Sequence, residues 1–480
     1  MLRFNKAELR EKILACWIGK NIGGTMGGPY EWSHDILDIK GFSTPPGEAL
    51  PNDDLDLQII WLKILEERGP RAINGQLMGE YWLNFIPPSW NEYGIGKSNL
   101  MMGLLPPLSG EYKNYWKNSN GAWIRSEIWA CCTPGCPDVA LHYAVQDAMV
   151  DHGMAEGTYA EMFTASIQSA AFVCDDIQKL IKIGLSKIPE NCRVAMSVNT
   201  VLDCHAKGVD WKECRQILVK ENEDLGMFQA PQNIAFTVLG LLYGNCDFKK
   251  SMILAINCGD DTDCTAATCG ALLGIMGGMK AIPEDWKAYI GDKLVSVAIN
   301  RGDVWGCPQT CTEFTDRILA VVPQVLYANH ANAYISETDP TDISEADFEK
   351  MCSRETAERL YSRPAWSYET DFVLGRAMVI FDGEPTIKAG GELKFKISVQ
   401  STMPDPRNST FKWHLPEGWS ISGPGSVYLR HWYNQPGDKP TVAEFTVTAG
   451  EKVEPFNRLL VEIEAPGRPT VGYIPVTVLG

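Results

Sequence analysis

Apolar residues recur at spacings of three and four between Lys6 and Leu326, which is the period of an amphipathic helix. Strand-like alternation is scarce there, and Gly/Pro clusters such as residues 103–110 separate the segments. The pattern predicts an all-α orthogonal helical bundle over residues 1–335. One typical stretch carries its apolar side chains at Leu57, Ile60, Trp61, Ile64 and Leu65.

The pattern changes after Tyr327. A polar, acidic stretch over residues 336–345 leads into one further helical segment near residues 346–360, so we expect residues 336–370 to form a helical connector. Later runs alternate apolar and polar positions, and their spacing predicts a small all-β, immunoglobulin-like sandwich over residues 371–480. The clearest of these runs are residues 392–399, 442–448 and 459–464.

Composition and charge narrow the class of partner. Sixty acidic residues against 43 basic ones give a formal charge of −17, which repels nucleic-acid backbones and anionic membrane surfaces. The 15 cysteines lie mostly in apolar helical stretches, which favours buried reduced thiols over disulfides. No apolar run has membrane-spanning length, and the first ten residues carry no apolar leader. We therefore expect a cytoplasmic protein with no nucleic-acid or membrane partner, and a homo-oligomer stays open.

The first group of candidate ligands is Asn52-Asp53-Asp54-Leu55-Asp56, at the start of a predicted helix. Adjacent carboxylates in one helical turn repel each other unless a cation neutralises them. The helix dipole and N-capping also make acids common at this place. The motif alone therefore fits a capping cluster and a metal site equally well.

The second group lies in the turn Asn257-Cys-Gly-Asp-Asp-Thr-Asp-Cys264, which also runs into a predicted helix. Its oxygen atoms are the hard ligands that suit Mg²⁺, Mn²⁺ or Ca²⁺. Small residues behind the turn allow this helix to approach a neighbour closely and to hold the acids deep in the domain. Buried carboxylates without compensation cost several kcal/mol each, so burial and charge density together favour a metal site. The small residues are Ala266, Ala267, Gly270, Ala271 and Gly274.

Four segments in order resemble the signatures of the ADP-ribosylglycohydrolase family. They are the glycine-rich opening at residues 15–31, the Asn-Asp-Asp motif at 52–54, the Asn-Gly-Ala-Trp-Ile-Arg region at 120–125 followed by His152, and the Gly-Asp-Asp-Thr-Asp-Cys motif at 259–264. The resemblance implies an orthogonal all-α fold and two divalent cations, Mg²⁺ or Mn²⁺. It carries the metal ligands over onto Asp53, Asp54, Asp261 and Asp263.

The chain departs from the family pattern at two ligand positions. Asn52 stands where the family usually has Ser or Thr, and its amide oxygen remains a candidate ligand. Cys264 stands where the family usually has Thr or Ser, and a thiol is a poor ligand for Mg²⁺. Either one site has changed, a softer metal such as Mn²⁺ is preferred, or Thr265 contributes instead.

The resemblance also suggests catalytic and substrate-binding residues. Glu31 matches a glutamate near the metals in part of the family, and we expect Glu31 and Asp54 to take part in the chemistry. Arg125 is a candidate for bidentate binding of a phosphate or carboxylate, or for bracing helices. The expected substrate-binding residues are Asn120, Gly121, Arg125, His152 and Glu161.

These observations predict a metal-dependent hydrolase of a glycosidic bond acting on a small-molecule or glycosylated substrate. One hypothesis is ADP-ribose release, as the resemblance implies. An alternative is an O- or N-glycosidase for a furanoside or oligosaccharide, which the tryptophan-rich insert at residues 84–129 and the sandwich favour. A further alternative is a binding protein without catalytic activity. Aromatic residues in the sandwich fit either a carbohydrate-binding face or a core, namely Trp413, Trp419, Tyr428 and Trp432.

Overall fold

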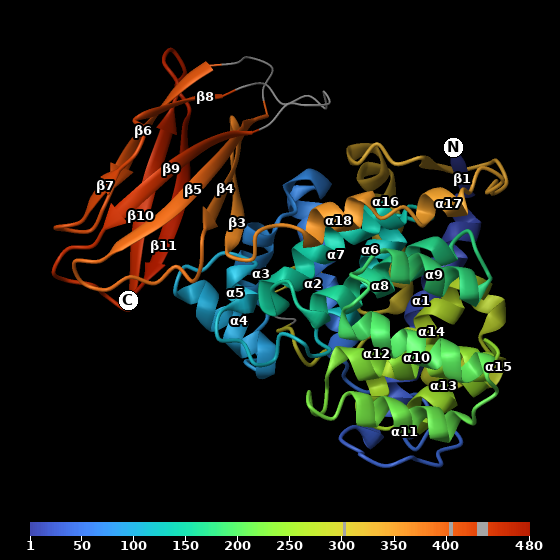
Figure 1. The fold of residues 1–480 in the computed structure, drawn as a ribbon. Helices are drawn as coiled ribbons and strands as arrows, with labels where there is room; N and C mark the ends of the chain where they lie inside the picture. Colours follow the sequence, from blue (N-terminus) through green and yellow to red (C-terminus); the bar gives the residue numbers. More distant parts are fainter. Residues whose placement is uncertain (301–303, 403–406, 430–439) are drawn as a thin grey trace.

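The computed structural model describes residues 1–300, 304–402, 407–429 and 440–480, and it contains a helical domain followed by a β domain (Figure 1). The helical domain confirms the all-α class that the sequence period predicts. Within the described ranges, no helix combines the length and apolar character needed to cross a membrane. The helices of this domain are α1 (Lys6–Gly27), α2 (Asp53–Arg68), α3 (Gly75–Phe85), α4 (Asn91–Met101), α5 (Leu108–Glu111), α6 (Glu127–Cys132), α7 (Pro137–His152), α8 (Glu156–Ala171), α9 (Ile177–Ser186), α10 (Arg193–Ala206), α11 (Trp211–Glu221), α12 (Ala230–Tyr243), α13 (Phe248–Asn257), α14 (Thr262–Gly277), α15 (Glu284–Ile290) and α16 (Cys311–Ala328).

Helices α1 and α14 pack against each other at the centre of this domain. A Cβ atom at Gly23 would collide with the backbone of Ala266, and one at Gly19 would collide with the carbonyl of Gly270. The small residues of α14 therefore face a glycine-rich side of α1, as the sequence predicts. This close approach places the start of α14 beside the end of α1.

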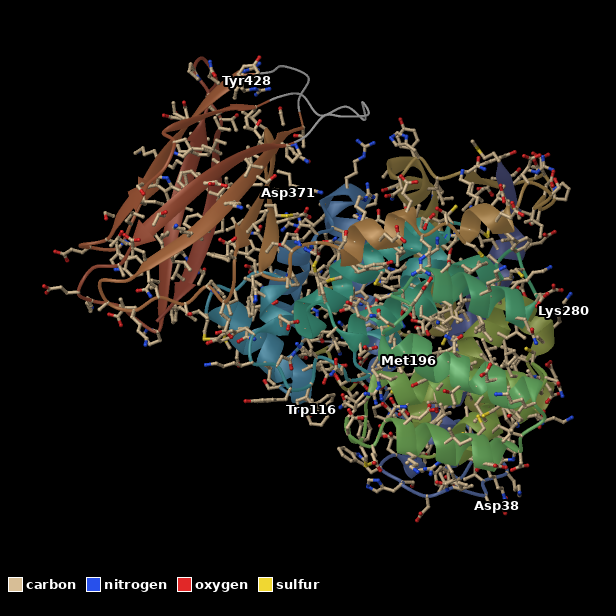
Figure 2. The ribbon with its side chains drawn as sticks, in the orientation of Figure 1. Asp38, Trp116, Met196, Lys280, Asp371 and Tyr428 are labelled. Atoms are coloured by element: carbon tan, nitrogen blue, oxygen red, sulfur yellow. The ribbon has the colours of Figure 1, made fainter. Side chains whose placement is uncertain are left out.

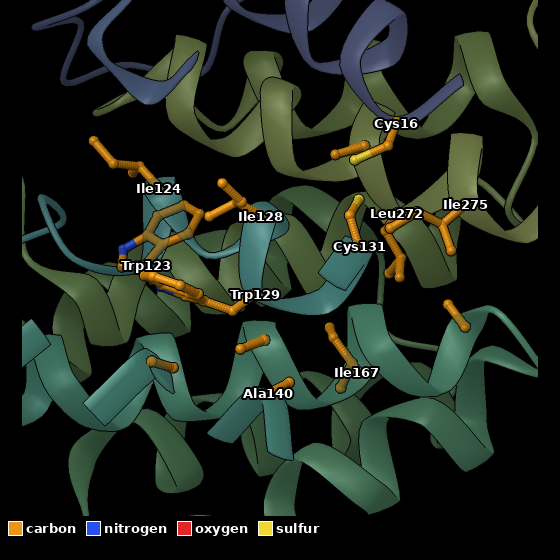
Figure 3. Packing of buried hydrophobic residues seen from close by; sticks show 14 of the residues in the cluster. Cys16, Trp123, Ile124, Ile128, Trp129, Cys131, Ala140, Ile167, Leu272 and Ile275 are labelled. Atoms are coloured by element: carbon orange, nitrogen blue, oxygen red, sulfur yellow. The ribbon is translucent and has the colours of Figure 1, made fainter. Parts of the chain in front are cut away.

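The core between the helices is apolar and includes several cysteines. Figure 3 shows Trp123 and Trp129 packed among aliphatic side chains, with Cys16 and Cys131 close by. In the described part of the chain none of the 15 cysteines forms a disulfide, and twelve of them are buried, which agrees with the expectation of reduced thiols.

A short parallel pair of strands closes the helical domain, where β1 (Leu2–Asn5) pairs with β2 (Ala333–Ser336). The connector that follows contains two short helices, α17 (Phe348–Met351) and α18 (Glu355–Tyr361), and so differs from the single predicted helix. The chain turns between them at Ser353, whose carbonyl accepts a hydrogen bond from the buried ammonium of Lys187 (2.5 Å).

The C-terminal domain consists of two antiparallel sheets, which confirms the predicted all-β region. The first strand begins at Ser367, slightly before the expected boundary at residue 371. One sheet has the order β11-β10-β6-β8 and the other the order β3-β4-β5-β9-β7. The strands are β3 (Ser367–Phe372), β4 (Gly375–Phe381), β5 (Glu392–Ser401), β6 (Arg407–His414), β7 (Ser420–Ser422), β8 (Ser426–Leu429), β9 (Thr441–Thr448), β10 (Phe456–Glu464) and β11 (Val471–Leu479).

The two domains share a contact at α4, α5 and the loop between these helices, which lie beside the β domain in Figure 1. Leu104 and Leu108 are 1% and 0% exposed and belong to the apolar core of the β domain. The hydroxyl of Thr477 donates to the carbonyl of Gly103 (2.7 Å), and Asn74 donates to Asp371 (2.9 Å), which Figure 2 places on the side facing the helices. The β domain is therefore anchored on α5, on the loop before it and on the start of α3 by both apolar and polar contacts.

Candidate metal centre

The first acidic motif begins α2. The side chain of Asn52 is the N-cap of this helix, because its Oδ1 accepts a hydrogen bond from the backbone N–H of Asp54 (2.8 Å). This bond occupies one of the two lone pairs of the amide oxygen, so Asn52 caps α2 and stays a candidate ligand. Asp53 accepts a hydrogen bond from the hydroxyl of Tyr93 (3.0 Å) and lines a cavity described below.

The second acidic motif forms the turn before α14. Asp260 has a positive φ of 67°, and its backbone exchanges hydrogen bonds with Trp32 and Ser33, which ties this turn to the segment carrying Glu31. The carboxylate of Asp261 accepts a short hydrogen bond from the amide of Asn120 (2.6 Å). The two motifs and the Glu31 segment are therefore brought together, although more than 200 residues separate Asp53 from Asp261.

Two groups of potential ligands result from this arrangement. In each group the ligand atoms lie within 4.8 Å of one another, and Asp263 belongs to both. Group A consists of Glu31, Asp261 and Asp263, and group B consists of Asp54, Asp263 and Cys264.

Three oxygen atoms of these buried carboxylates have no hydrogen-bond partner. Asp261 Oδ1, Asp263 Oδ1 and Asp54 Oδ2 are all buried without a hydrogen-bond partner. An uncompensated buried carboxylate is costly, and a divalent cation is the usual compensation when several carboxylates converge. The residues of group A therefore fit a hard cation such as Mg²⁺ or Mn²⁺.

The protonation behaviour agrees with this crowding. Burial, and next the neighbouring carboxylate of Asp263, raise the pKa of Glu31 to about 10. Burial raises the pKa of Asp54 and of Asp261 well above the ordinary range, and the charge of Asp263 adds to both. Without a cation, these carboxylates repel one another when ionised, which favours their protonated forms.

Group B contains the thiol that replaces the usual hydroxyl. Cys264 Sγ donates to Asp54 Oδ1 (3.3 Å), and burial, followed by the neighbouring carboxylates, raises the pKa of this thiol well above its ordinary value. Thr265 is fully buried and does not line the cavity described below, and its hydroxyl donates to the backbone carbonyl of Thr262 (3.2 Å). Group B therefore offers a neutral thiol where a hard cation needs an oxygen.

The groups open into a cavity of about 720 Å³. Five carboxylates line it, and aromatic rings form part of its wall. Trp32 and Trp90 are 62% and 44% exposed, and the ring of Trp32 stands over that of Phe228 with 4.1 Å between centroids. The lining carboxylates are Glu31, Asp53, Glu92, Asp261 and Asp263.

Of the expected substrate-binding residues, Asn120 and Gly121 line this cavity. Arg125, His152 and Glu161 do not line it, and each is fully buried. The expectation of direct substrate contact is therefore corrected for these three residues.

Their surroundings give the physical reason. The guanidinium of Arg125 pairs with Asp147 (2.9 Å) and Asp151 (2.8 Å), which neutralises its charge inside the core. His152 bonds to Asp151 through Nδ1 (2.9 Å) and to Ser119 through Nε2 (3.2 Å). Arg125 and His152 thus brace α7 against the loop that carries Asn120. For Arg125, bracing of helices is one of the two roles that the sequence leaves open.

The comparison with known families agrees with this geometry. The family model described as ADP-ribosylglycohydrolase matches residues 5–320, about two-thirds of the chain. The chain belongs to the ADP-ribosylglycohydrolase family. No match was found among curated proteins.

Several residues of this candidate site were missed by sequence reasoning. Tyr93 lies far in sequence from both acidic motifs, and Trp32 directly follows Glu31, but only the fold shows that both rings reach the cavity. Lys20 is fully buried on α1, with Nζ 3.0 Å from Glu127 Oε1 and 3.7 Å from Asp54 Oδ2. Burial lowers the pKa of Lys20, but Glu127 and Asp54 outweigh burial and raise it overall.

Two of the aromatic residues for which the sequence left a carbohydrate-binding face and a core open pack into the core of the β domain. Trp413 packs against Phe445 with ring centroids 5.0 Å apart, and Trp419 is 7% exposed. Tyr428 is exposed and lies at the outer end of the domain, distant from the helices (Figure 2). Trp432 lies outside the described residues.

Proposed function

We propose that this chain is a divalent-metal-dependent hydrolase that cleaves a glycosidic bond. The observation that carries the proposal is the set of carboxylates of group A, whose unpartnered oxygens converge on a cavity large enough for a sugar and its leaving group. Membership of the ADP-ribosylglycohydrolase family supports the same reaction class.

Each group at the cavity has a role in this proposal. Bound at group A, a Mg²⁺ or Mn²⁺ ion, with Ca²⁺ as a further candidate, supplies a water of lowered pKa and coordination sites for vicinal sugar hydroxyls. With a cation at group A to offset the neighbouring carboxylates, Glu31 would be ionised and would take the proton of the attacking water, because it is the member of group A that is only half-buried. Water adds across the bond, so the sugar gains the hydroxyl and the leaving group gains the proton. Asn120 holds Asp261 in place, and Tyr93 holds Asp53.

The family favours ADP-ribose on an amino acid or small acceptor as the substrate. The cavity wall supports a second candidate, an uncharged furanoside or oligosaccharide. Exposed tryptophan rings stack on sugar faces, and the carboxylates around them disfavour a diphosphate. Trp32 and Trp90 are the residues that carry this second candidate.

The deciding experiment measures hydrolysis of ADP-ribosylated arginine and serine peptides and of an aryl-glycoside panel, with Mg²⁺ or Mn²⁺. Asp261→Asn removes a group A ligand and should abolish turnover, typically by several orders of magnitude. Asp260→Asn is the matched control, because Asp260 bonds to Phe228 N (2.9 Å) and Gln232 (2.5 Å) and lies outside both groups.

The outcomes separate the candidates. Metal-dependent release of ADP-ribose, lost in Asp261→Asn and kept in Asp260→Asn, supports the family reaction. Turnover confined to the glycosides supports the uncharged substrate. Metal binding without turnover on either set contradicts the hydrolase and supports a binding protein without catalytic activity.

A further inference from the structure

Lys20 carries a positive charge at the inner side of the centre. Its ammonium lies between Glu127 and Asp54, and all three side chains have no solvent exposure. The remaining bonds of Glu127 come from the amides of Gln58 (2.9 Å) and Gln168 (3.0 Å), so this carboxylate is held in place from three sides. The ammonium is therefore a fixed part of the site.

The carboxylate of Asp54 is engaged by protein groups at both oxygens. Its Oδ2 faces the Lys20 ammonium at 3.7 Å, and its Oδ1 accepts the hydrogen of the Cys264 thiol at 3.3 Å. Asp54 is also fully buried and does not line the cavity. A cation entering group B would have to displace the thiol hydrogen and stand close to the ammonium.

Group A differs in each of these respects. Its three members are carboxylates, all three line the cavity, and two of them present buried oxygens without a partner. Hard divalent cations prefer such oxygen ligands, and like charges repel a second cation near Lys20.

We propose that the Lys20 ammonium takes the place of one cation, and that this chain binds a single divalent cation at Glu31, Asp261 and Asp263. This inference rests on the proposed metal centre but does not require turnover. It also accounts for the Cys264 thiol, which is tolerated because no hard cation has to bind there.

The test counts Mn²⁺ bound per chain after equilibrium dialysis of the full-length, metal-stripped protein, and records the electron paramagnetic resonance spectrum. Wild type should bind one Mn²⁺ and give the spectrum of an isolated ion. The double variant Lys20→Met with Cys264→Thr removes the ammonium and restores a hydroxyl, so it should bind two. Lys12→Met is the matched control, because Lys12 lies on the same helix but donates to the carbonyls of Phe172 and Met276.

Two Mn²⁺ bound per wild-type chain, or the spectrum of a spin-coupled Mn²⁺ pair, would overturn the inference. Binding of a second Zn²⁺ or Co²⁺ ion by the Cys264 thiolate of wild type would overturn it as well. The wild-type count decides even where the double variant fails to fold, and Cys264→Thr alone should still bind one ion because Lys20 remains. If wild type binds one Mn²⁺ per chain but hydrolyses no substrate, this inference is supported and only the proposed hydrolase activity is contradicted. If wild type binds no Mn²⁺, the proposed metal centre itself is refuted.

Discussion

Replacing Asp263 by Asn should have opposite effects on stability with and without a metal. Asp263 belongs to both ligand groups, and its ligand oxygen lies within 4.8 Å of carboxylate oxygens of Glu31, Asp261 and Asp54. Two carboxylates at that separation repel by about 3 kcal/mol at an effective dielectric constant near 20. The repulsion is smaller where a neighbour keeps its proton, so we expect the metal-free variant to be more stable than wild type by about 1 to 3 kcal/mol.

A bound cation should reverse this order. Wild type gains about 2.7 kcal/mol when the free metal is at one hundred times its dissociation constant. Asp263→Asn loses a shared ligand and should gain much less. The unfolding midpoints of the two proteins should therefore cross between EDTA and Mn²⁺, as measured by thermal and urea unfolding.

Asp260→Asn provides the comparison for this experiment. It changes the same charge in the same turn, but Asp260 already has hydrogen-bond partners for both oxygens. Its variant should be less stable than wild type by a similar amount in EDTA and in Mn²⁺. The reasoning is refuted if Asp263→Asn destabilises the metal-free protein, or if Mn²⁺ stabilises it as much as wild type.

Two further predictions concern the contact between the domains. Leu108→Ala should reduce the free energy of unfolding, measured in urea, by about 2 to 5 kcal/mol, because this side chain is fully buried in the core of the β domain. Leu83→Ala is the control and should change the free energy of unfolding little, because Leu83 is 36% exposed. Equal effects of the two substitutions would contradict the anchoring role of Leu108. Burial, and next the guanidinium of Arg376, lower the pKa of His142 to about 4. Between pH 6.5 and 4, His142 is therefore protonated in the unfolded chain but neutral in the folded chain. The free energy of unfolding should fall between pH 6.5 and 4, and His142→Gln should flatten this dependence; an unchanged slope would show that other groups cause it.

The sequence was sufficient to predict the two acidic motifs and the fold class. Each motif lies at the start of a helix, where N-capping and the helix dipole favour acidic residues, so the motifs could be located from local sequence alone. The small residues of α14 also predict a close helix neighbour, since packing at that distance needs them. The strands followed from their period-two alternation.

Other features depend on contacts distant in sequence. The role of Arg125 is decided by Asp147 and Asp151 on α7, and no local pattern links these residues. The capping role of Asn52 and the exposure of Trp32 depend likewise on backbone conformation: an N-cap bond in one case and a positive φ of 69° in the other. The pairing of Lys20 with Asp54 joins α1 to α2, and a glycine-rich helix gives no sign of it.

Helix α4 connects the β domain with the cavity, and this suggests what the β domain contributes. The loop directly after α4 is held by the β domain through Leu104 and the bond from Thr477 to Gly103. The other end of the same helix carries Glu92 and Tyr93, which line the cavity, and Tyr93 holds Asp53. A rigid helix transmits the position of one end to the other, so loosening the β domain should displace one wall of the cavity and the hydrogen-bond partner of Asp53. The β domain therefore matters for the shape of the site through α4, whether or not it binds carbohydrate itself.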